Sequence, residues 1–477
     1  MYRATKIVAT LGPASHSSQV LSQMIRAGLD VVRLNFSHGT ADDHRASAAM
    51  VRDCAKAVGR EVAIIGDLQG PKIRVGQFAK GKTTLAPGAA FILDANCEVG
   101  DDTRVGLDYR DLPRDVQAGD VLLLNDGLIV LDVARVSGDE IHTVVRVGGE
   151  LSNHKGVNRQ GGGLSAPALT DKDKEDIHTA MSLGADFIAV SFPKSGADMA
   201  LARELANAAG VPYGLQPQLI AKIERAEAVP ALQEILDASD GIMVARGDLA
   251  IEVGNAAVPA LQKRMIRMAR ESNRFVITAT QMMESMIHSP VPTRAEVSDV
   301  ANAVLDGTDA VMLSAESAVG QYPVETVAVM ASICIEAEKA DQPDLDRDFR
   351  HHMFTHIDHS VAMGALFTAF HLGAKAIVSL TESGATPLWM SRHWVQLPIF
   401  ALTPRVVSER AMAVYRNVTP LHLDPNHDRD TAWHEAVDLM VEKSFVSRGD
   451  VVVLTAGEMG QSGGTNTLKI VRIGEGA

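Results

Sequence analysis

The stretches LIAKIE at residues 219–224 and GIMVARGD at residues 241–248 decide the fold. Each begins with a short apolar run, ends in charged residues or glycine, and is followed by a helical pattern. Runs of this kind recur along the chain and predict parallel strands that alternate with helices. The predicted strands are residues 6–9, 31–35, 63–67, 187–191, 219–224, 241–245, 275–279 and 310–314.

Several of these runs are almost wholly apolar, which is typical of strands that are buried on both faces. Helices would cover the outer face of such a sheet, and side chains of the other strands would cover the inner face. The sequence therefore predicts an α/β fold, a (β/α)8 TIM barrel. An open doubly wound sheet is the alternative arrangement.

The barrel pattern is interrupted once and is followed by a separate unit. Between residues 71 and 163, short Val/Ile/Leu runs alternate with Pro-Gly and Gly-Asp turns, which predicts an all-β domain inserted after the third barrel strand. A charged, proline-containing stretch begins at Asp341, and a new α/β pattern follows it, with strands at 376–380, 399–402, 418–423 and 451–455. The predicted domains are residues 1–70 and 164–340 for the barrel, 71–163 for the inserted β domain and 341–477 for a C-terminal α/β domain.

Composition excludes several classes of partner. The 477 residues carry 45 Lys and Arg against 59 Asp and Glu, a net charge of −14, so the chain repels nucleic acid. The longest apolar stretch, residues 361–370, is half a membrane span. The cysteines Cys54, Cys97 and Cys334 show no disulfide framework and are interpreted as inert core residues of a cytoplasmic protein. The histidines of residues 351–356 are interpreted as a linker and helix start rather than a metal site.

Polar residues follow the predicted strands at their C-terminal ends, where barrel enzymes place their chemistry. Glu224 and Asp248 come from neighbouring strands, and an oxygen-only pair of this kind suits Mg²⁺ or Mn²⁺. The alternative is a salt bridge at the barrel rim. The whole set is Arg33, Asn35, Ser37, Asp67, Lys222, Glu224, Asp248 and Thr280.

Positive groups among these residues indicate an anionic substrate. Lys222 lies two residues before Glu224, so both side chains project to the same face of the strand. This lysine could stabilise a transferring phosphoryl group or a developing enolate, unless an ion pair with Glu224 leaves it no free donor. Arg33 and Arg74 supply local positive charge in an acidic chain. These residues predict a metal-assisted enzyme that acts on a phosphorylated substrate.

Five segments resemble the motifs of pyruvate kinase, of the bacterial type. They are KIVATLGPAS at 6–15, VRLNFSHG at 32–39, GIMVARGDL at 241–249, ATQMMESM at 279–286 and MLSAE at 312–316. The resemblance runs in order through the whole chain, and it implies that the inserted domain is a β-barrel-like lid and that the C-terminal domain is regulatory. It implies transfer of the phosphoryl group of phosphoenolpyruvate to ADP, followed by protonation of the enolate to pyruvate.

The resemblance also implies roles for individual residues. Glu224 and Asp248 would hold Mg²⁺, and Lys222 would stabilise the phosphoryl group and the enolate. Thr280 would relay a proton through water, because a threonine hydroxyl is a poor acid alone. The remaining matches are Gly247 and Asp248 for the substrate carboxylate, Arg33 and Arg74 for phosphate, and Pro13, His38, Lys172 and the lid residue Asp126 for the nucleotide.

The monovalent-cation site of the family matches Asn35, Ser37, Asp67 and the backbone of Leu68. Lys72 stands where potassium-dependent members carry glutamate, and an ammonium group can replace a bound monovalent cation. The segment therefore resembles the potassium-independent subgroup. It predicts activity without K⁺, and a K⁺ requirement in the variant Lys72→Glu.

In the C-terminal unit, a loop after a predicted strand resembles the family's effector site. Its hydroxyls and N–H groups could hold a phosphate, although a capped strand-to-helix turn is the alternative. The loop at 457–466 carries Glu458 and lacks basic residues, which favours a monophosphate such as a hexose phosphate, ribose 5-phosphate or AMP over fructose 1,6-bisphosphate. The loop consists of Thr381, Glu382, Ser383, Gly384, Ala385 and Thr386.

The resemblance further implies a homotetramer. Two rival functions stay open from the residues alone. A metal-dependent lyase or aldolase of pyruvate enolate would share the Glu/Asp pair but would not explain the lid or Lys222. A catalytically silent sugar-phosphate or nucleotide sensor would keep the scaffold without needing the set Arg33, Lys222, Glu224, Asp248 and Thr280.

Overall fold

The computed structural model describes residues 2–340, 354–393, 395–424, 429–457 and 464–474. Eight parallel strands close into a barrel in the order β1-β18-β17-β16-β15-β14-β3-β2. Closure confirms the predicted TIM barrel and excludes the open sheet. The barrel strands are β1 (Lys6–Thr10), β2 (Val31–Asn35), β3 (Ala63–Asp67), β14 (Phe187–Val190), β15 (Gln218–Ile223), β16 (Gly241–Ala245), β17 (Phe275–Ala279) and β18 (Ala310–Leu313).

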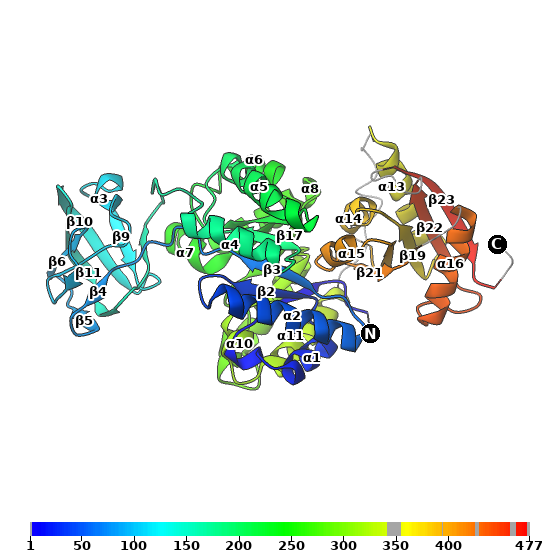
Figure 1. The fold of residues 1–477 in the computed structure, drawn as a ribbon, viewed down its shortest axis with the longest axis horizontal. Coiled ribbons are helices and arrows are strands. Elements are labelled where there is room, and N and C mark those ends of the chain that lie inside the picture. The colour runs from blue at the N-terminus through cyan, green and yellow to red at the C-terminus, as the bar shows by residue number, and fades with distance from the viewer. Residues whose placement is uncertain (1, 341–353, 394, 425–428, 458–463, 475–477) are drawn as a thin grey trace.

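Helices surround the barrel and bury its outer face (Figure 1). Local sequence sets their ends: Thr40 caps α2 together with Asp43, and Gly59 ends this helix in a left-handed conformation. The α-helices are α1 (Ser18–Ala27), α2 (Ala41–Val58), α4 (Asp171–Ser182), α5 (Gly196–Gly210), α6 (Leu232–Ala238), α7 (Arg246–Val253), α8 (Val258–Glu271), α9 (Arg294–Leu305), α10 (Ala315–Ala318) and α11 (Pro323–Glu338). Short 3₁₀ turns lie at η1 (Pro13–Ser15), η2 (Val211–Tyr213) and η3 (Glu284–Ile287).

The lid is a β unit inserted between β3 and α4, and it projects from one end of the barrel (Figure 1). Its main sheet has the order β13-β9-β10-β11-β6-β8, with the pairs β12-β5 and β4-β7 beside it, and it has its own buried core. The elements are β4 (Gln77–Phe78), β5 (Lys82–Leu85), β6 (Ala90–Asp94), β7 (Val99–Gly100), β8 (Arg104–Val105), α3 (Leu112–Asp115), β9 (Val121–Leu124), β10 (Ile129–Ser137), β11 (Glu140–Val147), β12 (Gly149–Ser152) and β13 (Val157–Arg159).

The C-terminal unit lies at the opposite end of the barrel from the lid (Figure 1). As far as it is described, its sheet has the order β21-β20-β19-β22-β23. The predicted strands are present, and β23, which runs antiparallel to β22, is an addition that the sequence pattern did not reveal. The elements are α13 (Ile357–His371), β19 (Ala376–Leu380), α14 (Ala385–Ser391), β20 (Ile399–Thr403), α15 (Val406–Met412), β21 (Val418–His422), α16 (Arg429–Glu442), β22 (Val451–Gly457) and β23 (Thr465–Arg472).

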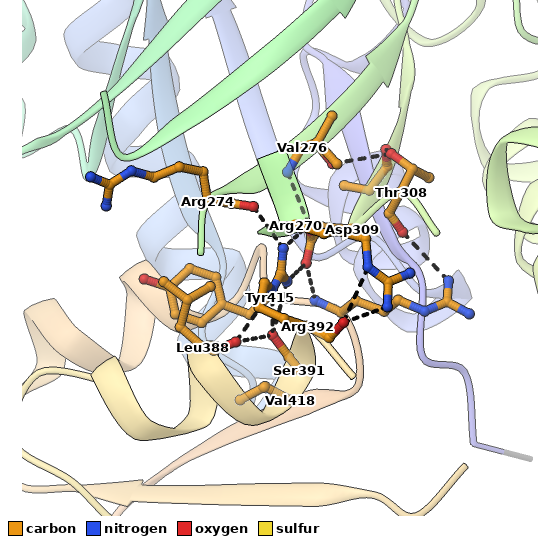
Figure 2. Close-up of polar contacts among 12 residues, drawn as sticks. Arg270, Arg274, Val276, Thr308, Asp309, Leu388, Ser391, Arg392, Tyr415 and Val418 are labelled. Carbon is orange, nitrogen blue, oxygen red and sulfur yellow. Dashed lines mark hydrogen bonds and ion pairs between the residues drawn. The ribbon is translucent and has the colours of Figure 1, made fainter. Parts of the chain in front are cut away.

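A buried ion pair joins the C-terminal unit to the barrel (Figure 2). Asp309, just before β18, and Arg392, just after α14, have side chains that are 0% and 5% exposed. Asp309 also accepts hydrogen bonds from the backbone N–H groups of Val276 and Arg416, both at 2.9 Å. Arg392 donates a further hydrogen bond to the carbonyl of Arg274 at 2.7 Å. The pair therefore connects β17, β18 and two segments of the C-terminal unit.

Three sequence interpretations meet the structure here. Cys54 and Cys334 are buried, whereas Cys97 is partly exposed, so it is not a core residue as interpreted. The histidines at 351–353 lie outside the described residues, and His356 directly precedes α13. Among the described helices, none combines the length and the apolar character that a membrane crossing requires.

Candidate active site

Charged side chains from three barrel strands, β2, β3 and β15, meet at the C-terminal end of the barrel. Arg33 Nε lies 2.5 Å from Asp67 Oδ2, and its guanidinium also contacts Thr10 Oγ1 at 3.0 Å. Lys222 Nζ lies 3.2 Å from Asp67 Oδ1 and 3.0 Å from Glu224 Oε1. The structure thus brings Arg33, Asp67, Lys222 and Glu224 into one connected cluster, all of which the sequence singled out.

Ser191, at the end of β14, completes this cluster. Lys222 donates to Ser191 Oγ at 2.7 Å, and the Ser191 hydroxyl donates to the carbonyl of Leu68 at 2.7 Å. Sequence reasoning did not assign Ser191 to the site. The signal was available, because Ser191 is the polar residue that ends a predicted strand.

Charge and burial set the protonation of the cluster. Burial alone would lower the pKa of Lys222, but the charges of Asp67 and Glu224 outweigh it and raise that pKa. Burial opposes ionisation of Asp67, yet Arg33 and Lys222 lower its pKa below the ordinary value. Lys222 is therefore a cation, and the ion pair with Glu224 that the sequence offered as an alternative is present.

Glu224 and Asp248 form the candidate metal pair. Glu224 follows β15 and is 3% exposed, and its Oε2 accepts from the N–H of Phe192 at 2.9 Å. Burial raises the pKa of Glu224, and the negative charge of Asp248 raises it further. A buried carboxylate whose charge is disfavoured by a neighbouring carboxylate fits a divalent cation. The described residues contain no group of three or more His, Cys, Asp or Glu that could hold a metal, so this pair would need oxygen ligands from substrate or water.

Helix α7 and the end of β17 place Gly247, Asp248 and Thr280 together. Gly247 donates its N–H to Thr280 Oγ1 at 2.8 Å, and that hydroxyl donates to the carbonyl of Ala279 at 2.6 Å. Thr280 has a φ of +70°, a strained conformation for a β-branched residue. Arg246 supports it, donating to the carbonyl of Thr280 at 2.7 Å and pairing with Asp299 at 2.8 Å. Sequence reasoning missed this role of Arg246.

Lys72 lies in the linker that leads from barrel strand β3 into lid strand β4, and it contacts Asp248 of the candidate metal pair. Its Nζ lies 3.0 Å from Asp248 Oδ1, and both side chains are about one quarter exposed, at 26% and 21%. Two of the residues predicted for the monovalent-cation site contact each other, since Asn35 Oδ1 accepts a hydrogen bond from the N–H of Ser37 at 3.1 Å. In the described structure the ion pair of Lys72 is with Asp248 rather than with Asp67.

Three of the residues assigned to the nucleotide lie at the same end of the barrel, and the fourth, Asp126, lies in the lid. Lys172 donates to the carbonyl of Phe36 at 2.8 Å, next to Ser37 and the exposed His38. Pro13 is exposed at the start of η1. Asp126 is exposed in the turn between β9 and β10, in a left-handed conformation.

Arg74 and the effector loop lie apart from the cluster. Arg74 donates to the carbonyl of His154 at 3.1 Å within the lid. Residues 381–384 connect β19 to α14, and Ala385 and Thr386, which the sequence assigned to the loop, begin this helix. Thr381 Oγ1 accepts from the N–H of Gly384 at 2.9 Å. Thr386 bonds to Thr465 at 2.7 Å, which joins this loop to β23. Residues 458–463 of the second loop, including Glu458, lie outside the described residues.

Known proteins match the chain along its length. The model of the pyruvate kinase barrel domain matches residues 2–327, and that of the pyruvate kinase alpha/beta domain matches residues 359–471. Pyruvate kinase II of Salmonella typhimurium is 52% identical over 99% of both chains. A pyruvate kinase of Haemophilus influenzae is 53% identical over 96% of both, and one of Geobacillus stearothermophilus is 42% identical over 98% of this chain and 80% of its own. Together with the barrel, the lid and the charged cluster, these matches show that the chain belongs to the pyruvate kinase family of phosphotransferases.

Proposed function

We propose that this chain transfers the phosphoryl group of phosphoenolpyruvate to ADP and protonates the resulting enolate to pyruvate, with Mg²⁺ or Mn²⁺. The observation that carries the proposal is the position of Lys222. It is a buried cation between Asp67 and Glu224, and Glu224 is in turn close enough to Asp248 to feel its charge. A phosphorylated enol needs positive charge at the point where its negative charge develops.

Glu224 and Asp248 would hold the divalent cation, whose chemistry is to neutralise and orient phosphoryl oxygens. Lys222 would keep its positive charge whether or not Glu224 holds a metal ion, because Asp67 pairs with Lys222 independently of Glu224. Arg33 is itself fixed by Asp67 and Thr10, so it can present a positioned guanidinium to phosphate. These residues bind and orient the substrate.

Thr280 would relay the proton. Its hydroxyl already connects the N–H of Gly247 to the carbonyl of Ala279. Because a threonine hydroxyl does not ionise near pH 7, it moves a proton only by passing it between neighbours. We propose water as the neighbour on the solvent side.

We further propose that the enzyme works without K⁺. The ammonium group of Lys72 stands at Asp248, so a fixed positive charge already lies beside the metal pair. Pro13, His38, Lys172 and the lid residue Asp126 would line the nucleotide site, and Arg74 would contact phosphate from the lid.

Pyruvate formation from phosphoenolpyruvate, ADP and Mg²⁺ tests both proposals when tetramethylammonium is the only monovalent cation. We expect full activity at once and no gain on adding K⁺. Activity only after K⁺ refutes the assignment of Lys72, and no activity in either buffer refutes the reaction. As a control on the lysine, Lys72→Glu should be active only with K⁺.

A phosphorylated effector is proposed at the loop of residues 381–386, with its hydroxyls as ligands. Ribose 5-phosphate, a hexose monophosphate or AMP should lower the phosphoenolpyruvate concentration for half-saturation, and fructose 1,6-bisphosphate should not. Ser383→Asp should abolish the response, because the new carboxylate repels phosphate. An unchanged response in this variant places the effector elsewhere.

We also propose a cytoplasmic homotetramer. Helix α13 exposes Ile357, Phe367 and Phe370, three large apolar side chains that a subunit contact would cover. Light scattering should give four times the chain mass of 50.9 kDa.

The proposed domain boundaries, after residues 70, 163 and 340, fall between β3 and β4, between β13 and α4, and after α11.

A further inference from the structure

The chain returns from the lid to the barrel through residues 160–170, between β13 and α4. Residues shortly after Glu224 hold this return linker against the barrel. Arg225 donates to the carbonyl of Leu164 at 3.3 Å, and a carboxylate oxygen of Glu227 accepts from the N–H of Gly163. The linker glycines Gly161, Gly162 and Gly163 have φ values of +82°, +77° and +89°, a conformation that other residues rarely adopt. A Cβ at Gly162 would lie 2.2 Å from a carboxylate oxygen of Glu227.

Glu252 connects this linker to helix α7. Its backbone carbonyl accepts from the N–H of Gly161 at 3.1 Å. Its Oε2 accepts from the N–H of Ala226 at 2.8 Å, two residues after Glu224. Its carboxylate is also hydrogen-bonded by Asn158 on lid strand β13, and α7 packs against this strand. One side chain thus connects the lid, the segment after Glu224 and the helix that carries Asp248.

The surroundings of Glu252 are mostly buried and partly charged. The residue is 5% exposed and borders a small cavity between the lid linkers and the barrel. That cavity is lined by Pro71, Lys72, Asn158, Leu164, Arg225 and Glu252. Burial and the charge of Glu227 raise the pKa of Glu252 to about 7, although Ala226, Arg225 and Asn158 favour its ionised form. Nothing in the proposed reaction requires a carboxylate here.

We propose that Glu252 is a positioning residue that couples the lid to the metal pair by fixing the segment after Glu224 and helix α7 relative to strand β13. The inference rests on the proposed function of Glu224 and Asp248 as metal ligands. A change in the lid would move both carboxylates through this residue, and loss of the residue would leave them less well placed.

The test compares Glu252→Ala, which removes the acceptor, with Glu252→Gln, which keeps an oxygen for Ala226. Glu150→Ala is the matched control, a lid carboxylate that is 58% exposed and pairs with Lys82. Three quantities are measured on the full chain: the Mn²⁺ dissociation constant by electron paramagnetic resonance, the kinetic constants for phosphoenolpyruvate, and the rate of trypsin cleavage after Arg159.

We expect Glu252→Ala to weaken Mn²⁺ binding by roughly tenfold, as for residues that orient metal ligands without binding the metal. It should also speed cleavage after Arg159, while Glu252→Gln and Glu150→Ala stay near the wild type. If Glu252→Ala lowers only the melting temperature and leaves Mn²⁺ binding unchanged, the proposal is wrong.

A second variant keeps the proposal testable if Glu252→Ala does not fold. Asn158→Ala removes the lid partner alone and should weaken Mn²⁺ binding in the same direction, whereas unchanged binding refutes the coupling. Failure of the proposed function is recognised separately, because a wild type that forms no pyruvate can still be assayed for Mn²⁺ binding and for cleavage.

Discussion

Replacing Arg392 by methionine should destabilise the C-terminal unit strongly. The substitution leaves Asp309 as an unpaired carboxylate that is fully buried between barrel and C-terminal unit. Breaking a buried pair by removing one partner costs about 3–5 kcal/mol. The N–H groups of Val276 and Arg416 still donate hydrogen bonds to Asp309 in this variant. The expected loss of unfolding free energy is therefore at the lower end of this range, about 3 kcal/mol.

Tryptophan fluorescence isolates the unit concerned. All three tryptophans, Trp389, Trp394 and Trp433, lie in the C-terminal part of the sequence. With a urea dependence of about 1–3 kcal/mol per molar, a loss of about 3 kcal/mol moves the unfolding midpoint down by at least about 1 M. The control Arg45→Met removes a surface pair whose partners are 50% and 92% exposed, and it should leave the midpoint almost unchanged.

The double variant Arg392→Met with Asp309→Asn separates lost attraction from buried charge. Because the second change removes the unpaired charge, it should recover part of the lost stability. A midpoint for Arg392→Met within about 0.3 M of the wild type would refute the reasoning, since it corresponds to a loss of at most about 0.9 kcal/mol.

Three other predictions concern the active site and the lid. Lys222→Met should reduce turnover by about 10²–10⁴-fold while Mn²⁺ still binds, and a variant with wild-type pyruvate formation would contradict the role of this lysine. The pKa of Glu252, raised from 4.5 to about 7, means that the folded chain holds a proton that the unfolded chain has lost, so stability should fall as the pH rises from 4.5 to 7. The fall is about 3 kcal/mol, and Glu252→Gln should flatten this part of the curve of melting temperature against pH. Gly162→Ala should change the rate of trypsin cleavage after Arg159, because the new Cβ would collide with Glu227 and displace the return linker. An unchanged cleavage rate would contradict this prediction.

The barrel could be predicted because burial on both faces leaves a clear pattern. The predicted strand at residues 241–245 coincides with β16, and the predicted strand at 187–191 differs from β14 only by Ser191. Site residues at strand ends could be found by the same reasoning. Strand β23 was missed, since its sequence TNTLKIVR is mainly polar and follows a glycine-rich stretch of sequence.

The joints between the units could not be predicted, because a buried carboxylate has the same appearance in a sequence as a solvated one. Asp309 and Arg392 are 83 residues apart, and Asn158 lies on a different unit from Glu252. At both joints a carboxylate accepts backbone N–H groups from a second element. They differ in charge balance, since a guanidinium contacts Asp309 directly, whereas backbone and amide hydrogen bonds and the nearby charge of Arg225 support Glu252. An ionised carboxylate that is buried without a directly bonded cation leaves its charge uncompensated, which destabilises the packing around it. In a hydrogen-exchange measurement, the backbone N–H groups at the lid joint should therefore exchange faster than those at the C-terminal joint. The opposite order would contradict this account.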